Sequence, residues 1–183
     1  MTKVFIGGSR NLTRLNGAIK QRLDRIVEIG HLILIGDANG ADKAVQQFMQ
    51  NRCYKRVEVF CTNGVCRNNL GDWPIRKVKA ARNAKGFEFY AVKDRLMAEE
   101  CSVGFMLWDG KSKGTQANIL RLLSSEKKVV VYVAPSRGFV TLRSKRDWEH
   151  FFLHRDATLS GKDKKSNASV EPKLSHSAQA ALF

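Results

Sequence analysis

Short apolar runs alternate with amphipathic stretches along the chain. The apolar runs are rich in β-branched and aromatic residues, a composition typical of strands that are buried on both faces of a parallel sheet. They occupy residues 3–6, 32–35, 57–61, 103–108 and 129–133. Between and after them, apolar residues recur at helical spacing near residues 13–29, 40–52, 88–101, 115–126 and 144–154. The alternation predicts a Rossmann-like, doubly wound α/β fold with a parallel sheet of about five strands, in the order 3-2-1-4-5, and helices on both faces.

Two stretches depart from this alternation. Residues 62–87 have weak periodicity and contain six Lys or Arg residues against one Asp. A loop of this length in a compact domain is usually functional or disordered. Two interpretations stay open, a basic lid over an anionic ligand or a solvated surface insertion. The segment 155–183 is polar and rich in Ser, Lys and Ala, which predicts a disordered tail. The predicted folded domain therefore covers residues 1–154.

Composition narrows the class of protein. With 183 residues, 43% of them apolar, the chain is long enough for one globular domain, and no apolar run approaches the length of a membrane span. The first residues enter a strand pattern without a secretory signal, so we expect a cytoplasmic protein that does not contact a membrane and whose four cysteines are reduced thiols. Two pairs of possible metal ligands occur, Cys61 and Cys66 at C-x4-C spacing and His150 and His154 at i, i+4 spacing. Neither pair has further ligands at metal-binding spacing. We therefore expect no metal site and no required cofactor.

The formal net charge is +15. A charge of this size favours an anionic partner, such as a nucleotide, a nucleic acid or an acidic surface, although a basic surface can also serve solubility alone. Nucleic-acid binding would predict basic residues with interleaved aromatic residues, and outside residues 62–87 there is little of this pattern. A nucleotide or another phosphorylated small molecule is therefore the favoured partner, and nucleic acid is the alternative.

Glycine-rich turns follow three of the predicted strands. Because ligands of an open parallel sheet bind beyond the carboxyl ends of its strands, we expect the three turns to share one site. In the first turn, Gly7 and Gly8 allow a ligand to approach the backbone, and Ser9 and Arg10 can hydrogen-bond a phosphate. Thr13 can cap the helix that follows.

In the second turn, Gly36 and Gly40 bracket a tight connection from strand to helix. Asp37 suits a turn conformation and equally suits a hydrogen bond with a ribose hydroxyl. Asp42 lies in the first turn of the next helix, where the helix dipole favours a carboxylate. A structural and a functional role are therefore equally open for Asp42.

The third turn lies in the sequence WDGKSKGTQANI. Asp109 and Gly110 end the strand, Lys113 supplies positive charge, and Gly114 and Thr115 begin a helix. Unpaired N–H groups at the N-terminus of a helix bind anions, and Thr115 can serve as the N-cap or as a hydroxyl contact to a phosphate. Together, the three turns predict a site for a phosphorylated ligand.

One carboxylate is unusual on the helix predicted for residues 88–101. The apolar stripe at i, i+4, i+7 and i+11 consists of Tyr90, Asp94, Met97 and Cys101. A carboxylate in such a stripe must be paired or must face a polar pocket. Asp94 is therefore a candidate catalytic residue, with Asp42 or Asp109 assisting. The alternative is a helix that is rotated so that Asp94 meets solvent.

Two motifs carry a resemblance to a known family. The first motif, GDANGADKAV, is similar to the G-x-A-x-G-A-D signature of YspA-related proteins. The second motif consists of KDRLM, a short strand and GKSKGT. It is similar to the R-N-x-x-M helix, strand and terminal G-T loop of the same proteins. Over about residues 3–134 the chain resembles the SLOG superfamily, the Rossmann-like group that contains the LOG proteins, DprA and the YspA/YpsA-related proteins. The resemblance implies a Rossmann-like fold that binds nucleotides or nucleotide-derived ligands. At the matching positions it adds Ala38, Lys93 and Asn118 to the candidate ligand-binding residues.

LOG enzymes hydrolyse the N-glycosidic bond of nucleoside monophosphates, and their G-T loop leads into a catalytic Glu. Asn118 occupies the matching position, and Lys93 and Asp94 occupy the position of an Arg-Lys pair. Because an amide cannot act as a general base, we do not expect LOG-type catalysis by the same residues. A nucleotide-binding sensor or carrier is the favoured function. An N-glycoside hydrolase or deoxyribosyltransferase-like enzyme that uses Asp94, and a DNA-binding protein, are the alternatives. A homodimer is also compatible with this fold, since many of its members pair.

Overall fold

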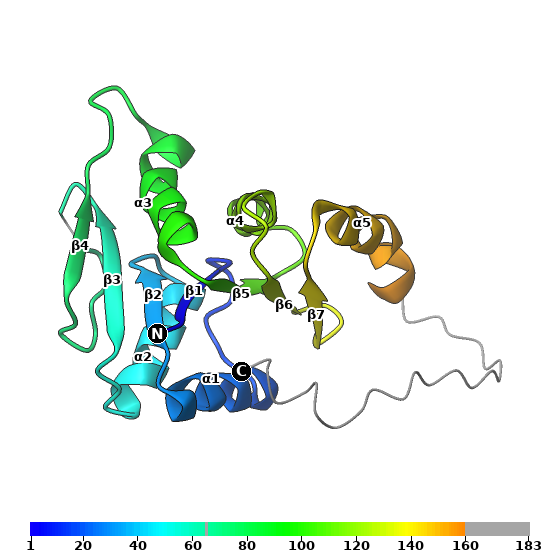
Figure 1. Ribbon diagram of the computed structural model, residues 1–183, viewed down its shortest axis with the longest axis horizontal. Coiled ribbons are helices and arrows are strands. Elements are labelled where there is room, and N and C mark those ends of the chain that lie inside the picture. Colours follow the sequence, from blue (N-terminus) through cyan, green and yellow to red (C-terminus); the bar gives the residue numbers. More distant parts are fainter. Residues whose placement is uncertain (65, 160–183) are drawn as a thin grey trace.

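The computed structural model describes residues 1–64 and 66–159, and this part of the chain forms a seven-stranded sheet with helices on both faces (Figure 1). The strands are β1 (Lys3–Gly8), β2 (Leu32–Gly36), β3 (Val57–Thr62), β4 (Ile75–Val78), β5 (Val103–Trp108), β6 (Val129–Val133) and β7 (Gly138–Leu142). Their order is β4-β3-β2-β1-β5-β6-β7, and neighbouring strands are parallel except for β6 and β7. The expected Rossmann-like α/β fold is confirmed, and the five expected strands lie next to one another in the expected order.

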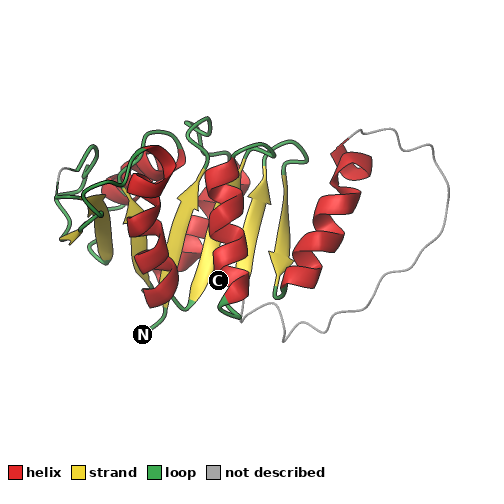
Figure 2. Cartoon of the chain, turned by 90° about the horizontal axis from the view of Figure 1, so that it is seen from above, coloured by secondary structure: helices red, strands yellow, loops and turns green. Residues whose placement is uncertain are grey.

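Helices cover both faces of the sheet (Figure 2). They are α1 (Gly17–Ile29) and α2 (Ala41–Asn51) on one face, and α3 (Gly86–Glu100), α4 (Lys113–Ser124) and α5 (Lys145–Leu159) on the other. Successive side chains of a strand point to opposite faces. Accordingly Val4 and Ile6 of β1 belong to the same buried cluster as Leu23 of α1, whereas Phe5 belongs to the cluster of Met97 of α3. Burial on both faces explains why the central strands are almost continuously apolar.

The apolar pattern did not predict the two edge strands β4 and β7. β4 has the sequence IRKV, and its first three residues are exposed. β7 is mostly half-buried and runs antiparallel to β6. An edge strand has a neighbour on one side only and needs no continuous apolar run. The sheet therefore has seven strands where about five were expected.

The stretch 62–87 is not one long loop, because its first part is attached to the sheet. Trp73 is buried, and its indole N–H donates a hydrogen bond to the carbonyl of Tyr54 at 2.7 Å. β4 follows directly and pairs with β3. Cys61 and Cys66 form a disulfide, so the expectation of reduced thiols is wrong for this pair. The segment between β4 and α3 is a second loop, which projects beyond the end of α3 in Figure 1.

The cap of α1 lies later in the chain than expected. Asn16 is the N-cap, because its side-chain oxygen accepts a hydrogen bond from the N–H of Ile19 at 2.9 Å. The helix therefore begins at Gly17, and Thr13 lies in the preceding loop.

The last helix is longer than expected. Trp148 of α5 packs against Trp108 of β5 with ring centroids 5.4 Å apart, and the helix continues to Leu159. Residues 155–159, which were assigned to the tail, are therefore helical, while the rest of that segment, 160–183, lies outside the described residues. In the described part of the chain, no helix combines the length and the apolar character needed to cross a membrane.

Candidate functional site

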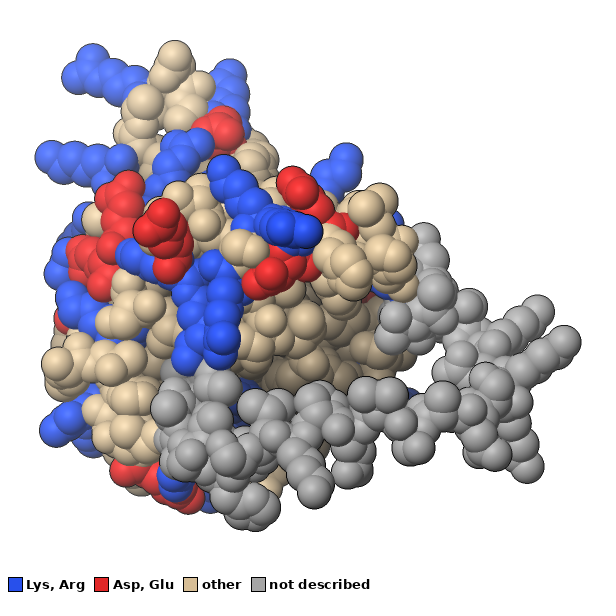
Figure 3. Space-filling model, turned by 45° about the vertical axis from the view of Figure 1, so that its right-hand side comes forward, with Lys and Arg blue, Asp and Glu red and all other residues tan. Residues whose placement is uncertain are grey.

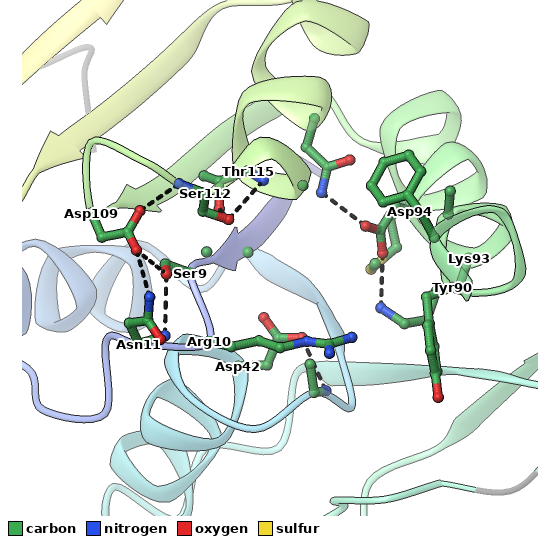
Figure 4. A pocket seen from close by; sticks show the side chains of 18 of the residues that line it. Ser9, Arg10, Asn11, Asp42, Tyr90, Lys93, Asp94, Asp109, Ser112 and Thr115 are labelled. Atoms are coloured by element: carbon green, nitrogen blue, oxygen red, sulfur yellow. Dashed lines mark hydrogen bonds and ion pairs between the residues drawn. The ribbon is translucent and has the colours of Figure 1, made fainter.

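The three glycine-rich turns meet beyond the carboxyl ends of β1, β2 and β5. α1 follows β1 and α4 follows β5, and the two helices cover opposite faces of the sheet, so a crevice opens between these neighbouring strands. A pocket of about 570 Å³ occupies this crevice (Figure 4). The residues in its wall that the sequence predicted are Gly7, Gly8, Ser9, Arg10, Ala38, Asp42, Lys93, Asp94, Asp109, Gly114, Thr115 and Asn118.

Five predicted binding residues lie outside the pocket wall, namely Gly36, Asp37, Gly40, Gly110 and Lys113. Gly36 lies behind the wall, where an added Cβ would come within 2.5 Å of the Asp42 carboxylate and 2.6 Å of the Lys93 ammonium. The absence of a side chain at Gly36 therefore makes room for two charged groups of the protein, not for a ligand.

The remaining glycines among these five shape the turns. Gly40 has a φ of 85°, and an added Cβ would lie 2.2 Å from the carbonyl oxygen of Arg10, so this glycine lets the second turn pack against the first. Gly110 has a φ of 82° and turns the chain at the end of β5. Lys113 is the exposed first residue of α4.

A buried ionic cluster forms the inner end of the pocket. The Lys93 side chain is almost fully buried, and its Nζ lies 2.8 Å from Oδ1 of Asp94 and 4.0 Å from Oδ1 of Asp37. The side-chain amide of Asn118 donates to Oδ2 of Asp94 at 3.0 Å. Both oxygens of Asp94 are thus engaged within the pocket, and α3 does not turn this carboxylate to solvent.

Two carboxyls near Lys93, Asp42 and Asp37, have pKa values shifted in opposite directions. Burial raises the pKa of Asp42 to about 6, with a further contribution from the charge of Asp94 and with Lys93 acting in the opposite direction. Burial also acts to raise the pKa of Asp37, but hydrogen bonds from Arg67 at 2.7–3.1 Å and the charge of Lys93 outweigh it and lower the pKa. Asp37 is therefore a fixed anion that anchors Arg67, while Asp42 is the wall residue that can change protonation near neutral pH.

Asp109 joins the first turn to the third. It accepts hydrogen bonds from the Ser9 hydroxyl at 2.7 Å and the Asn11 amide at 3.0 Å, and from the backbone N–H groups of Lys111 and Ser112 at 3.0 and 2.7 Å. Burial acts to raise the pKa of this carboxyl, but these bonds outweigh it and hold the pKa at about 2. Such a carboxylate exchanges no proton near neutral pH, and its four hydrogen bonds hold the two turns together. The Ser9 hydroxyl donates its single proton to Asp109, so it is not free to donate to a ligand.

Replacing Asp109 by alanine is expected to lower the free energy of unfolding by about 1–2 kcal/mol, because four donors lose their common acceptor. Urea denaturation followed by circular dichroism measures the change. The matched control is Glu149→Ala on the exposed surface of α5, for which a change within about 0.5 kcal/mol is expected. Equal midpoints for the two variants would show that the bonds to Asp109 do not hold the turns together.

The N-terminus of α4 opens toward the pocket. Ser112 is its N-cap and accepts hydrogen bonds from the N–H and the hydroxyl of Thr115 at 3.3 and 3.0 Å. Thr115 is therefore not the cap, and its hydroxyl proton is already used. An added Cβ at Gly114 would meet only the ring of Phe87, at 3.8 Å. The space in front of the helix end is thus open to a ligand.

Cationic and aromatic side chains surround the pocket entrance. The guanidinium carbons of Arg10 and Arg67 lie 5.3 and 4.5 Å from the ring centroid of Tyr90. Lys111 and Phe87 also belong to the wall and are exposed. Figure 4 shows Arg10 extending between the turn residues Ser9, Asn11 and Asp109 on one side and Tyr90, Lys93 and Asp94 on the other. The entrance is therefore positively charged and aromatic, whereas the inner end is lined by carboxylates and one buried ammonium.

Sequence reasoning did not assign a binding role to part of the wall: Phe5, Asn11, Arg67, Gly86, Phe87, Tyr90, Ala91, Met97 and Ser112. For Tyr90 a signal existed, because it lies four residues before Asp94 on the same stripe of α3. Arg67 belongs to the basic stretch already singled out, but its contact with Asp37 spans 30 positions in the sequence and has no local signature.

No side-chain cluster suited to a metal ion occurs in residues 1–64 and 66–159.

The fold is similar to that of a protein of known structure. No protein-family model matches the chain, and no curated protein matches it. Among solved structures, DNA processing protein A (DprA) from Helicobacter pylori has a similar fold, with a TM-score of 0.53 and 19% sequence identity over 71% of this chain. The matched part is 64% of the length of that structure. DprA is described there as having a unique mode of binding single-stranded DNA. At this identity the likeness establishes the fold, and DprA is one of the proteins of the superfamily that the motifs resemble.

Proposed function

We propose that the protein is a member of the SLOG superfamily that binds a nucleotide unit in the pocket, and that single-stranded DNA is the form of this ligand favoured by the comparison with DprA. The observation that carries the proposal is the entrance, where Arg10 and Arg67 lie against the ring of Tyr90. Aromatic rings stack on bases and neighbouring guanidinium groups neutralise phosphates, a combination that single-strand binding sites use.

The distribution of charge orients the ligand. A phosphate at the inner end would meet the Asp42 and Asp94 carboxylates, which repel it. At the entrance it meets Arg10, Lys111 and the open N-terminus of α4, all of which attract it. The inner carboxylates can accept hydrogen bonds from sugar hydroxyls or from exocyclic amines of a base. The phosphate therefore lies outermost, and the sugar or the base points inward.

A polymer and a free nucleotide would use the same entrance. The net charge of +15 and the relation to DprA favour single-stranded DNA. The enclosed inner end, with its polar groups, favours a single nucleotide, the function first expected from the sequence. Titration with single-stranded DNA and with free nucleotides shows which of the two ligands the pocket binds.

Calorimetric titration with an oligo-dT strand and with a panel of nucleoside monophosphates tests the proposal. Arg10→Ala is expected to weaken binding about tenfold, because a charge-assisted contact to a phosphate is lost. The matched control is Arg14→Ala, which removes the same charge from an exposed residue of the same loop outside the pocket wall. Equal affinities for the two variants, or no binding of either ligand by the wild type, refute the proposal.

Hydrolysis of a bound nucleotide is the second candidate function, and the pKa of Asp42 favours it. A general acid or base works best when its pKa lies near the working pH, and burial raises that of Asp42 to about 6. Asp94 adds a carboxylate 3.0 Å from Asn118, the residue at the position of the LOG catalytic Glu. Chromatography of the titrated nucleotides for free base tests this function. If the nucleotide is bound and no free base appears, hydrolysis is refuted and the function is binding alone.

A further inference from the structure

The segment between β4 and α3 carries three cations that form no ion pair within the described residues. We define the basic arm as residues 79–85, with Lys79, Arg82 and Lys85 as its cations, all of them exposed. In residues 1–64 and 66–159, no ion pair involves any of these three side chains. The arm contains no acidic residue. Its positive charge is therefore available to a partner.

Some exposed cations elsewhere in the described residues form ion pairs, whereas the arm cations form none. Arg76, three residues before the arm, lies 2.6 Å from Glu100 and 4.0 Å from Glu58. Arg52 lies 2.8 Å from Asp24 on neighbouring helices. In Figure 3, Lys and Arg side chains project at the top of the molecule, the height at which Figure 1 shows the arm. Charges that project from the body of a protein and have no partner within it suit the backbone of a nucleic acid.

The arm leads directly into the pocket wall. Its base is held by a hydrogen bond from the N–H of Ala80 to the side chain of Asn63 at 2.9 Å. At its other end, Lys85 is followed by Gly86 and Phe87, both of which line the pocket. Phe87 is 55% exposed, which is a large exposed fraction for an aromatic residue. The basic arm is therefore followed along the chain by the exposed residue Phe87, which lies at the cationic entrance of the pocket.

We propose that the basic arm and Phe87 form a track for single-stranded nucleic acid, along which the strand approaches the pocket that holds one of its nucleotides. This inference rests on the proposed function. The arm cations contact successive phosphates, and Phe87 stacks on a base outside the pocket. Single-strand binding proteins combine the same two elements, a positively charged groove along the backbone and aromatic side chains under the bases. A free nucleotide would be held by the pocket alone and would not contact the arm.

Substitution of the arm cations tests the track. The arm variant is Lys79→Ala/Arg82→Ala/Lys85→Ala. The control variant is Lys20→Ala/Lys55→Ala/Lys145→Ala, which removes the same charge from exposed positions on α1, before β3 and at the start of α5. Fluorescence anisotropy with labelled oligo-dT and oligo-rU strands at several salt concentrations measures affinity, and calorimetry measures the binding of nucleoside monophosphates.

The arm variant is expected to bind the strands roughly tenfold to a hundredfold more weakly than the control at about 0.1 M salt. Its slope of log affinity against log salt becomes shallower by about 2, because each phosphate neutralised on a single strand contributes about 0.7. Monophosphate affinity stays the same in both variants. A loss for oligo-dT alone or for oligo-rU alone identifies the natural strand as DNA or RNA.

The two proposals fail in different ways. If the wild type binds strands but the two triple variants have equal affinity and equal slope, the track is refuted and the pocket function stands. If the wild type binds monophosphates and no strand, the track is again refuted, and the ligand is a free nucleotide. If the wild type binds neither ligand, both the proposed function and the track are refuted.

Discussion

Replacement of Lys93 by methionine is expected to lower the free energy of unfolding by about 3–5 kcal/mol at neutral pH. The Lys93 side chain is almost fully buried, and it lies 2.8 Å from Asp94 and 4.0 Å from Asp37. Burial acts to lower the pKa of the ammonium, but the charges of Asp94 and Asp42 outweigh it and raise the pKa. Methionine fills a similar volume and supplies no charge, so the buried carboxylates would lose their counter-ion.

Urea denaturation of the Lys93→Met variant measures this loss. The matched control is Lys43→Met on the exposed side of α2, for which a change within about 0.5 kcal/mol is expected. The loss should shrink at about pH 5, because Asp42, whose pKa is about 6, is then mostly protonated and needs no counter-ion. A variant as stable as its control would show that the carboxylates do not depend on Lys93.

The protonation of Asp42 is expected to make the wild type more stable in acid than at neutral pH, by up to about 3 kcal/mol from this group. Its pKa rises from 3.8 in an ordinary environment to about 6 in the folded protein, and each pKa unit corresponds to about 1.4 kcal/mol. The folded state therefore binds a proton more tightly than the unfolded state. This contribution is fully present below about pH 3.8 and is lost as the pH rises through about 6.

Asp42→Asn removes the titration while its side-chain oxygen can still accept the hydrogen bond from Ala38. Urea denaturation at several pH values between about 4 and 7.5 compares the variant with the wild type. The variant should lack the fall in stability near pH 6, whereas Asp72→Asn, the same change at an exposed residue, should keep it. Parallel profiles for the wild type and Asp42→Asn would mean that Asp42 is not protonated in this range.

Local patterns in the sequence determined the core of the fold. Five strands are buried on both faces, so each is a continuous apolar run, and the amphipathic stretches between them can only be crossover helices. Because the strands are parallel, their carboxyl ends and the glycine-rich turns that follow them lie at one edge of the sheet. Edge strands β4 and β7 have no such signature, because an exposed edge does not require apolar residues.

Only the tertiary structure decided which contacts each predicted site residue makes. Asp109 and Ser9 were candidates for ligand contact from their local sequence, whereas Asn11 gave no signal. Hydrogen bonds from Ser9 and Asn11 to Asp109, which span about a hundred positions, join the first turn to the third. Gly36 was expected to face a ligand, and instead it accommodates Asp42 and Lys93. The entrance formed by Tyr90, Arg10 and Arg67 comes from three distant segments. The physical reason is that secondary structure follows from spacing along the chain, whereas the pairing, burial and pKa of a charged group depend on neighbours that are brought together only by folding.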